Sequence, residues 1–349
     1  MNASTITLVR PDDWHLHLRD GEPMRSVVAA TARVFARAVV MPNLEPPVTT
    51  VAAAAAYRER IAAALPSGSR FAPLLTLYLT DQTTAEEIAH ARRSGFIVGV
   101  KYYPAGATTH SEAGVTELSR AYPALEAMQR EGLPLLVHGE ATDPDIDIFD
   151  RERVFVERTL SHIVRDFPGL RVVLEHASTT EAVDFVAGAP AHIGATITPQ
   201  HLLFSRNALL AGRIRPHLYC MPVLKREEHR RALLRAATGG NPKFFLGTDS
   251  APHSRHAKEN ACGCAGCYSA HAALELYAEA FSAADALERL EGFASFHGAD
   301  FYGLPRNRDK VTLRREPWKV PEEYTFGDSK VVPLLAGEVL HWRAVDAPE

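Results

Sequence analysis

Histidine, lysine and aspartate residues follow short apolar runs at several places in this chain. His15 and His17 alternate in the triplet HLH, so in an extended segment both side chains would lie on one face. The others are Lys101 in VGVKYY, His138 in LLVHGE, His176 in VVLEHAS and Asp249 in FFLGTDS. Imidazole and carboxylate groups suit Zn²⁺, with Mn²⁺ or Co²⁺ as possible substitutes. Four histidines and one aspartate exceed the ligand set of a mononuclear catalytic zinc, so they predict two metal ions roughly 3.5–4 Å apart.

Each of these residues also has an ordinary interpretation. A single histidine at the end of a strand is commonly a hydrogen-bonded structural residue, and an HxH triplet by itself is a modest metal signal. Asp249 precedes Ser-Ala-Pro and could cap a helix. The repeated occurrence of such residues at the ends of predicted strands is what favours the metal site.

Lys101 is an unusual neighbour for a pair of metal ions, because an ammonium group would be repelled by two dications. Burial and positive neighbours would lower its pKa and leave a neutral amine. A neutral amine can react with CO₂ to form a carbamate, N6-carboxylysine, whose carboxylate could bridge both metals. The alternative is an ordinary lysine paired with an aspartate or a glutamate.

The elements that must position these residues are strands and helices in alternation. Apolar runs predict strands at residues 14–18, 38–41, 73–80, 97–101, 135–139, 171–176, 192–198 and 244–249. Helical stretches are expected at residues 23–37, 52–65, 84–94, 115–131, 151–166 and 180–187. This alternation indicates a parallel sheet, and eight strands favour a closed (β/α)8 TIM barrel, an α/β fold whose active sites lie at the C-terminal ends of the strands.

Length and composition fit one globular domain. The 349 residues are 46% hydrophobic and 23% charged, and we interpret residues 1–349 as a single barrel domain with residues 303–349 as a C-terminal extension packed on the barrel. A net charge of −4 provides no basic field for nucleic acid. No apolar run reaches the ~18 residues of a membrane helix. The N-terminus lacks a secretory pattern, so we expect a cytoplasmic protein.

Four cysteines occur, and three of them are close together. They are Cys220, Cys262, Cys264 and Cys267. In a reducing cytosol we expect free thiols. The spacing Cys-x-Cys-x-x-Cys without a paired second half is a weak signal for structural zinc. We therefore expect a tight glycine-rich turn with buried thiols, with a structural zinc site as the alternative.

Several long motifs resemble the bacterial single-function dihydroorotases, amidohydrolases of pyrimidine biosynthesis. They are DDWHLHLRDG, VVMPNLEPPVTT, VGVKYYPAGATT, LLVHGE, VVLEHAS, ATITPQHLLFSRN and FFLGTDSAPHSRHAKENACGCAGC. The match continues to the C-terminal LAGEVLHW and so covers nearly the whole chain. The resemblance implies a (β/α)8 barrel, two Zn²⁺ per subunit, carboxylation of Lys101 and a homodimer.

The resemblance also implies a role for each candidate residue. The metal ligands would be His15, His17, Lys101, His138, His176 and Asp249. The more buried ion would be bound by His15, His17 and Asp249, and the second ion by His138 and His176. Carboxylated Lys101 would bridge the two ions. Substrate contacts would come from His17, Arg19, Asn43, Thr108, Thr109, His138, Met221, His253 and Ala265.

Within that set, Arg19, Asn43 and His253 would hold a substrate carboxylate, and the planar guanidinium of an arginine suits this task. Met221 and Ala265 would contact the substrate through backbone groups. Thr108 and Thr109 would lie on a mobile loop that closes over the substrate. The alternatives are a solvated surface arginine, a turn asparagine and a plain mobile loop at residues 104–109.

The implied reaction is the reversible zinc-dependent interconversion of N-carbamoyl-L-aspartate and (S)-dihydroorotate on the route to UMP. A metal-bridging hydroxide would attack the cyclic amide, and Asp249 would be the general acid and base. One rival is another cyclic amidase, such as a hydantoinase or an allantoinase. A second is an inactive barrel that serves as a scaffold, which the complete ligand set argues against.

Overall fold

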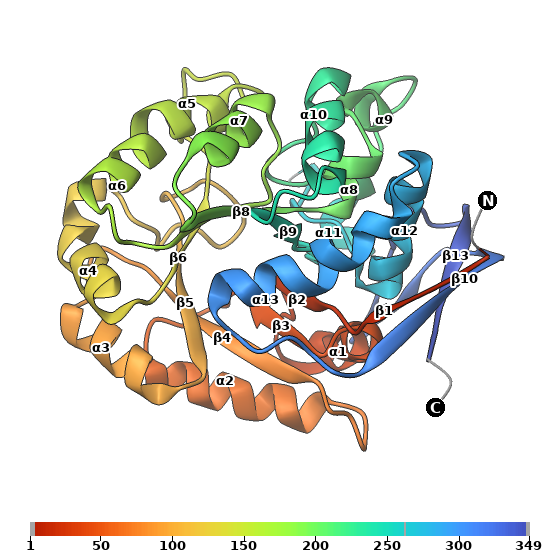
Figure 1. Ribbon diagram of the computed structural model, residues 1–349, viewed down its shortest axis with the longest axis horizontal. Helices are drawn as coiled ribbons and strands as arrows, with labels where there is room; N and C mark the ends of the chain where they lie inside the picture. The colour runs from red at the N-terminus through yellow and green to blue at the C-terminus, as the bar shows by residue number, and fades with distance from the viewer. Residues whose placement is uncertain (1–3, 262, 347–349) are drawn as a thin grey trace.

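Eight parallel strands form the centre of the molecule, and helices surround them (Figure 1). The computed structural model describes residues 4–261 and 263–346. The strands pair in the order β2-β3-β4-β5-β6-β7-β8-β9. Their bounds are β2 Asp12–Leu16, β3 Arg37–Val40, β4 Ala72–Tyr78, β5 Ile97–Tyr102, β6 Leu135–His138, β7 Val172–Glu175, β8 Ile193–Ile197 and β9 Phe244–Leu246. Each predicted strand overlaps one of these, and the predicted TIM barrel is confirmed.

Helices follow most of the strands on the outside of the barrel (Figure 1). The α-helices are α1 Gly21–Val34, α2 Val51–Ala64, α3 Ala85–Ser94, α4 Leu118–Glu131, α5 Arg151–Phe155, α6 Ser161–Asp166, α7 Thr180–Gly188, α8 Pro199–Leu203, α9 Arg206–Leu210, α10 Glu227–Thr238, α11 Arg255–Lys258, α12 Ala273–Ala283 and α13 His297–Tyr302. The described residues also contain two π-helical turns, η1 Val156–Leu160 and η5 Gly292–Phe296. Three 3₁₀ turns are η2 Pro216–Leu218, η3 Ala270–Ala272 and η4 Leu287–Arg289. The six predicted helices are present, whereas α8 to α13 were not predicted.

Local sequence explains where several helices begin and end. The hydroxyl groups of Thr50, Thr84 and Thr179 accept the backbone N–H three residues ahead, which caps the starts of α2, α3 and α7. Helices α3 and α4 end at Gly95 and Gly132, both in the left-handed conformation that glycine adopts without strain.

The barrel closes between its first and last strands through side-chain and loop contacts. The carboxylate of Asp13 in β2 accepts hydrogen bonds from Thr248, at 2.9 Å from its N–H and 2.6 Å from its hydroxyl. The backbone N–H of Asp249 donates to the carbonyl of His15 at 2.8 Å. These bonds hold the loop after β9 against β2, so they place Asp249 beside His15.

Apolar side chains fill the barrel below this level. Trp14 stacks on Tyr302 of α13, with ring centroids 4.6 Å apart, and the ring of Phe245 packs against Trp14 at an interplanar angle of 79°. A Cβ at Gly298 would lie 2.0 Å from Nε1 of Trp14, so only glycine allows α13 to approach this closely. The lower part of the barrel is therefore a packed core, and the open space lies at the other end.

The two ends of the chain meet in a separate antiparallel sheet. Its order is β1 Thr5–Val9, β10 Lys310–Lys319 and β13 Val339–Asp346, and a small hairpin joins β11 Tyr324–Phe326 to β12 Ser329–Val331. The backbone of β13 is held against the barrel by Glu275 and Glu279 of α12. The extension packs on the barrel as predicted, but its pairing with an N-terminal strand was not predicted. Across the described ranges, none of the helices is both long and apolar enough to cross a membrane.

Candidate active site

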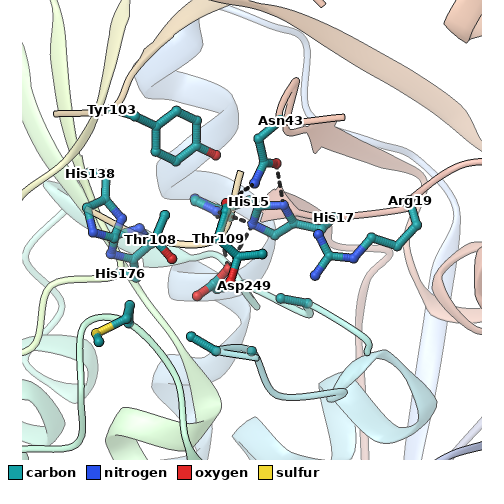
Figure 2. Close-up of a pocket in the computed structure, with 14 residues that line it drawn as sticks. His15, His17, Arg19, Asn43, Tyr103, Thr108, Thr109, His138, His176 and Asp249 are labelled. Atoms are coloured by element: carbon teal, nitrogen blue, oxygen red, sulfur yellow. Dashed lines mark hydrogen bonds and ion pairs between the residues drawn. The ribbon is translucent and has the colours of Figure 1, made fainter. Parts of the chain in front are cut away.

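A polar pocket opens at the C-terminal ends of the barrel strands (Figure 2). About 360 Å³ within it is free of protein atoms, a volume that includes solvent at its open mouth. Its fourteen lining residues are His15, His17, Arg19, Asn43, Tyr103, Thr108, Thr109, His138, His176, Met221, Asp249, Ala251, Ala265 and Gly266. All except Tyr103, Ala251 and Gly266 are candidates from the sequence. Of the predicted site residues, only Lys101 and His253 are not among those that line the pocket.

Three of the predicted metal ligands point their donor atoms at one spot. Oδ1 of Asp249 lies 3.4 Å from Nε2 of His15 and 3.1 Å from Nε2 of His17. The two Nε2 atoms are 3.4 Å apart. Two imidazole nitrogens and a carboxylate oxygen at these separations form a candidate metal centre.

The strands end earlier than the sequence predicts, which changes how the ligands are presented. Strand β2 ends at Leu16 and β9 at Leu246, so His17 and Asp249 lie beyond them. Asp249 and His176 have φ angles of 44°, in the left-handed region that such residues adopt rarely. These ligands are therefore positioned by loop conformation as well as by the alternation of a strand.

His138 and His176 form the opposite wall of the pocket (Figure 2). Their ring centroids lie 4.8 Å apart, and the ring of His176 lies 5.0 Å from that of His15. Nε2 of His138 lies 2.8 Å from the buried carboxylate of Glu140, which leaves Nδ1 for a ligand. His15, Glu175 and His176 make up a second group of possible metal-ligand atoms, and no sequence motif had singled out Glu140 or Glu175.

Lys101 is completely buried beneath the pocket, where its amine makes a short contact with the carboxylate of Glu175. Oε2 of Glu175 also lies 2.9 Å from Nδ1 of His15. Burial lowers the pKa of Lys101, while the charge of Glu175 opposes that shift. The amine of Lys101 thus lies against a buried glutamate that also contacts a candidate ligand, His15.

Burial and charge act in opposite directions on the ligand histidines. Burial, reinforced by His138 and Lys101, lowers the pKa of His176 well below its usual value, so its ring is neutral. Burial opposes the charged form of His15 too, yet Glu175 and Asp249 raise its pKa to about 9. Asp249 is buried too, yet the neighbouring rings of His15 and His17 hold its pKa well below the usual range. A metal ion would take over the role of the proton on His15.

Arg19 forms a second, cationic corner of the pocket, and His253 contacts its guanidinium. Nε of Arg19 donates to the carbonyl of Pro252 at 2.9 Å, and its Nη2 lies 2.9 Å from Nε2 of His253. The same histidine nitrogen lies 3.0 Å from the carbonyl of Ala265. Burial and the charge of Arg19 lower the pKa of His253 to about 2, so the imidazole is neutral. Arg19 is thus a half-buried, oriented side chain and not a solvated surface arginine.

The loop that carries Thr108 and Thr109 is tied to the pocket by Asn43. Nδ2 of Asn43 donates to the carbonyl of Thr109 at 3.3 Å, and Oδ1 lies 2.8 Å from Nδ1 of His17. The hydroxyl of Ser111 donates to the carbonyl of Thr108 at 2.6 Å. Both threonines lie on the pocket wall, and Asn43 is a buried link rather than an exposed turn residue.

The cysteines lie behind the loops that carry Met221 and Ala265. Cys220 and Cys267 are buried, and their thiols donate to the carbonyls of Pro222 and His217, each at 3.3 Å. Cys264 is half-buried, and Cys262 lies outside the described residues. Among the residues described, no candidate metal group contains a cysteine. This arrangement fits the expected turn with buried thiols.

Comparisons with known proteins point the same way as the pocket. The amidohydrolase family profile matches residues 5–321. A dihydroorotase of Nitrosococcus oceani is 65% identical over 344 residues, which cover 99% of this chain and 100% of the relative. The structure of a Saccharomyces cerevisiae dihydroorotase in complex with 5-fluoroorotic acid superposes with a TM-score of 0.92 at 33% identity, covering 99% of this chain and 100% of that chain. The structure of a dihydroorotase of Campylobacter jejuni superposes with a TM-score of 0.90 at 34% sequence identity, covering 99% of this chain and 98% of that chain.

Proposed function

The chain belongs to the amidohydrolase family and, within it, to the dihydroorotases, and from this premise we propose that it interconverts N-carbamoyl-L-aspartate and (S)-dihydroorotate in pyrimidine (UMP) biosynthesis. It is a cyclic amide hydrolase. The observation that carries the choice of substrate is the position of Arg19, which contacts His253, in the same pocket as the candidate metal ligands. A cation beside a hydrolytic centre suits a cyclic amide that bears a carboxylate.

The donor atoms of this pocket fit the two zinc ions that we propose. Nδ1 of His176 is buried and has no hydrogen-bond partner among the described residues, so it is available as a ligand. Nε2 of His15 and His17 converge on Oδ1 of Asp249. We propose that Lys101, once carboxylated, holds both ions together with these residues and His138. Bound Zn²⁺ would lower the pKa of a water molecule and polarise the amide carbonyl of the substrate.

The protein's own groups have separate tasks in the proposed reaction. The Arg19 guanidinium would hold the substrate carboxylate together with Asn43 and His253, which fixes the ring in the pocket. Asp249 would take the proton of the attacking water and give it to the amide nitrogen that leaves as the ring opens. In the direction of ring closure the same proton moves back. The backbone at Met221 and Ala265, with Thr108 and Thr109, would complete the enclosure of the substrate.

The nearest rival is a hydantoinase or an allantoinase, which would use a similar metal centre on a different ring. Arg19, together with His253 beside it and Asn43 elsewhere on the pocket wall, favours an acidic substrate over these. We further propose that the protein acts as a homodimer in the cytoplasm, as the resemblance to dihydroorotases implies.

One set of assays tests the proposal against its rivals. The zinc-loaded protein is given N-carbamoyl-L-aspartate, dihydroorotate, hydantoin and allantoin, and ring opening or closure is followed for each. We expect turnover of the first two only, loss of activity after chelation and recovery with Zn²⁺, Mn²⁺ or Co²⁺. Turnover of hydantoin or allantoin in place of dihydroorotate would favour the rival cyclic amidase, and no turnover at all would favour an inactive barrel.

A further inference from the structure

We propose that the hydroxyl of Tyr103 donates a hydrogen bond to a carbonyl oxygen of the bound substrate. Tyr103 was not a candidate from the sequence, and it differs in chemistry from the metal ligands and the cationic corner. The inference rests on the proposed function, because it assigns one further contact in the same pocket.

Tyr103 presents an unsatisfied donor to the pocket. The residue follows β5, two positions after Lys101, and its side chain turns to the same side of the barrel. It is only 1% exposed, and its hydroxyl has no hydrogen-bond partner among the described residues. Figure 2 shows this hydroxyl pointing toward the middle of the pocket. Buried hydroxyl groups are rarely left without a partner, so a ligand is the natural acceptor.

The neighbours of the ring fix its direction and do not consume its hydroxyl. The ring centroid of Tyr103 lies 5.1 Å from that of Tyr78 and 5.9 Å from that of His138. The amine of Lys101 lies over the face of the ring, 4.9 Å from the centroid, whereas the hydroxyl projects from the edge in the ring plane. The hydroxyl of Tyr78 is already used, since it donates to the carbonyl of His110 at 3.3 Å.

The chemistry of the donor and the position of the ring select the acceptor. An ordinary phenol has a pKa of about 10, so at neutral pH the Tyr103 hydroxyl carries its proton and can donate. In Figure 2 the ring lies on the side of His138, and Arg19 lies on the far side of the pocket beyond Asn43. If Arg19 holds the carboxylate of the substrate, the oxygen that faces Tyr103 belongs to the other part of the ring, where the carbonyl groups are.

Tyr103→Phe in the zinc-loaded enzyme removes only this hydroxyl, and Tyr302→Phe is its matched control. Tyr302 is also buried with an unpartnered hydroxyl, but it stacks on Trp14 in the lower core and does not line the pocket. For the wild type and both variants we would measure kcat and KM in both directions, zinc per chain, and the shift in Tm that dihydroorotate produces.

We expect Tyr103→Phe to lower kcat/KM by about ten-fold to a hundred-fold, as loss of one hydrogen bond to substrate does. The ligand-induced shift in Tm should shrink, while the zinc content and the ligand-free Tm stay at or above those of the wild type. Tyr302→Phe should leave kcat/KM unchanged.

Three results would overturn the inference. The first is a kcat/KM of Tyr103→Phe within two-fold of the wild type. The second is a loss of zinc from that variant, which would assign the hydroxyl to the metal centre. The third is a fall in the ligand-free Tm of the variant, which would give the hydroxyl a structural role. If the wild type does not turn over dihydroorotate, the proposed function fails first, so the two failures are distinguishable.

Discussion

The side chain of Asn43 fixes which nitrogen of His17 is free to bind a metal. Its Nδ2 donates to the carbonyl of Thr109, which can only accept, so the other amide atom, Oδ1, must face His17. Because Oδ1 is an acceptor, Nδ1 of His17 carries the proton across their 2.8 Å contact. Nε2 is left bare, and it is the atom that faces Asp249. One asparagine thus links a candidate metal ligand to the loop over the pocket.

Replacing Asn43 should separate these two contacts. Asn43→Asp keeps an acceptor for His17 but places a negative charge against the carbonyl of Thr109 and the proposed substrate carboxylate. We expect its KM to rise at least about ten-fold with near-normal zinc content. Asn43→Ala removes the acceptor as well, so zinc affinity should also fall. Kinetics together with metal analysis by mass spectrometry would check this, and equal zinc affinity in the two variants would contradict it.

Glu140 should act as a positioning residue for His138. Its buried carboxylate lies 2.8 Å from Nε2 of that histidine and orients the ring so that Nδ1 faces the pocket. We expect Glu140→Ala to weaken binding of one zinc ion by about 10- to 100-fold, with Glu140→Gln intermediate. Competition with a chromophoric chelator measures this.

Glu152→Gln is the matched control for Glu140. Glu152 is equally buried, but its carboxylate accepts from the backbone of Ser178 and the hydroxyl of Thr179 and not from a candidate ligand. Zinc affinity should be unchanged in this variant. A similar loss in both variants would indicate general damage to the barrel rather than positioning of His138.

Asp249→Asn tests the proton transfer. An amide cannot take up and return the proton of the attacking water, so kcat should fall by at least about a hundred-fold. The Arg19 corner is untouched, so binding of dihydroorotate should stay measurable by calorimetry. Zinc content must be determined alongside, since Oδ1 of Asp249 also faces two ligand histidines. A variant that keeps its zinc and its activity would exclude this role.

Glu152 should also make stability depend on pH. Burial raises the pKa of its carboxyl from 4.5 to about 7, although Lys225 and the hydrogen bonds from residues 178 and 179 oppose the shift. Below pH 4.5 the folded and unfolded states are both protonated. Between that value and pH 7 the unfolded state gives up its proton first, so rising pH costs the folded state up to about 1.4 kcal/mol per pH unit.

Glu152→Gln removes this dependence. Relative to the wild type, the free energy of unfolding of the variant should increase from pH 5 to pH 8, by on the order of 1 to 3 kcal/mol. Urea unfolding at both pH values provides the measurement. A difference between the two proteins that does not change with pH would show that Glu152 keeps a normal pKa in the folded state.

The sequence by itself determined the class of fold and most of the pocket. Short apolar runs separated by helices predict parallel strands, and the C-terminal ends of such strands must gather at one end of a barrel. His15, His138 and Lys101 were therefore expected near one another although they lie far apart in the chain. The motifs that resemble dihydroorotases added the roles of Arg19 and Asn43.

Only the tertiary structure decided the contacts between residues that no motif connects. Glu175 beside Lys101, Glu140 behind His138 and the free hydroxyl of Tyr103 depend on how side chains from different strands point into shared space. The same holds for β1 and β10, where Thr5 pairs with Arg314. Hydrophobic periodicity reports which face of an element is buried, but it carries no information on the partner that covers that face.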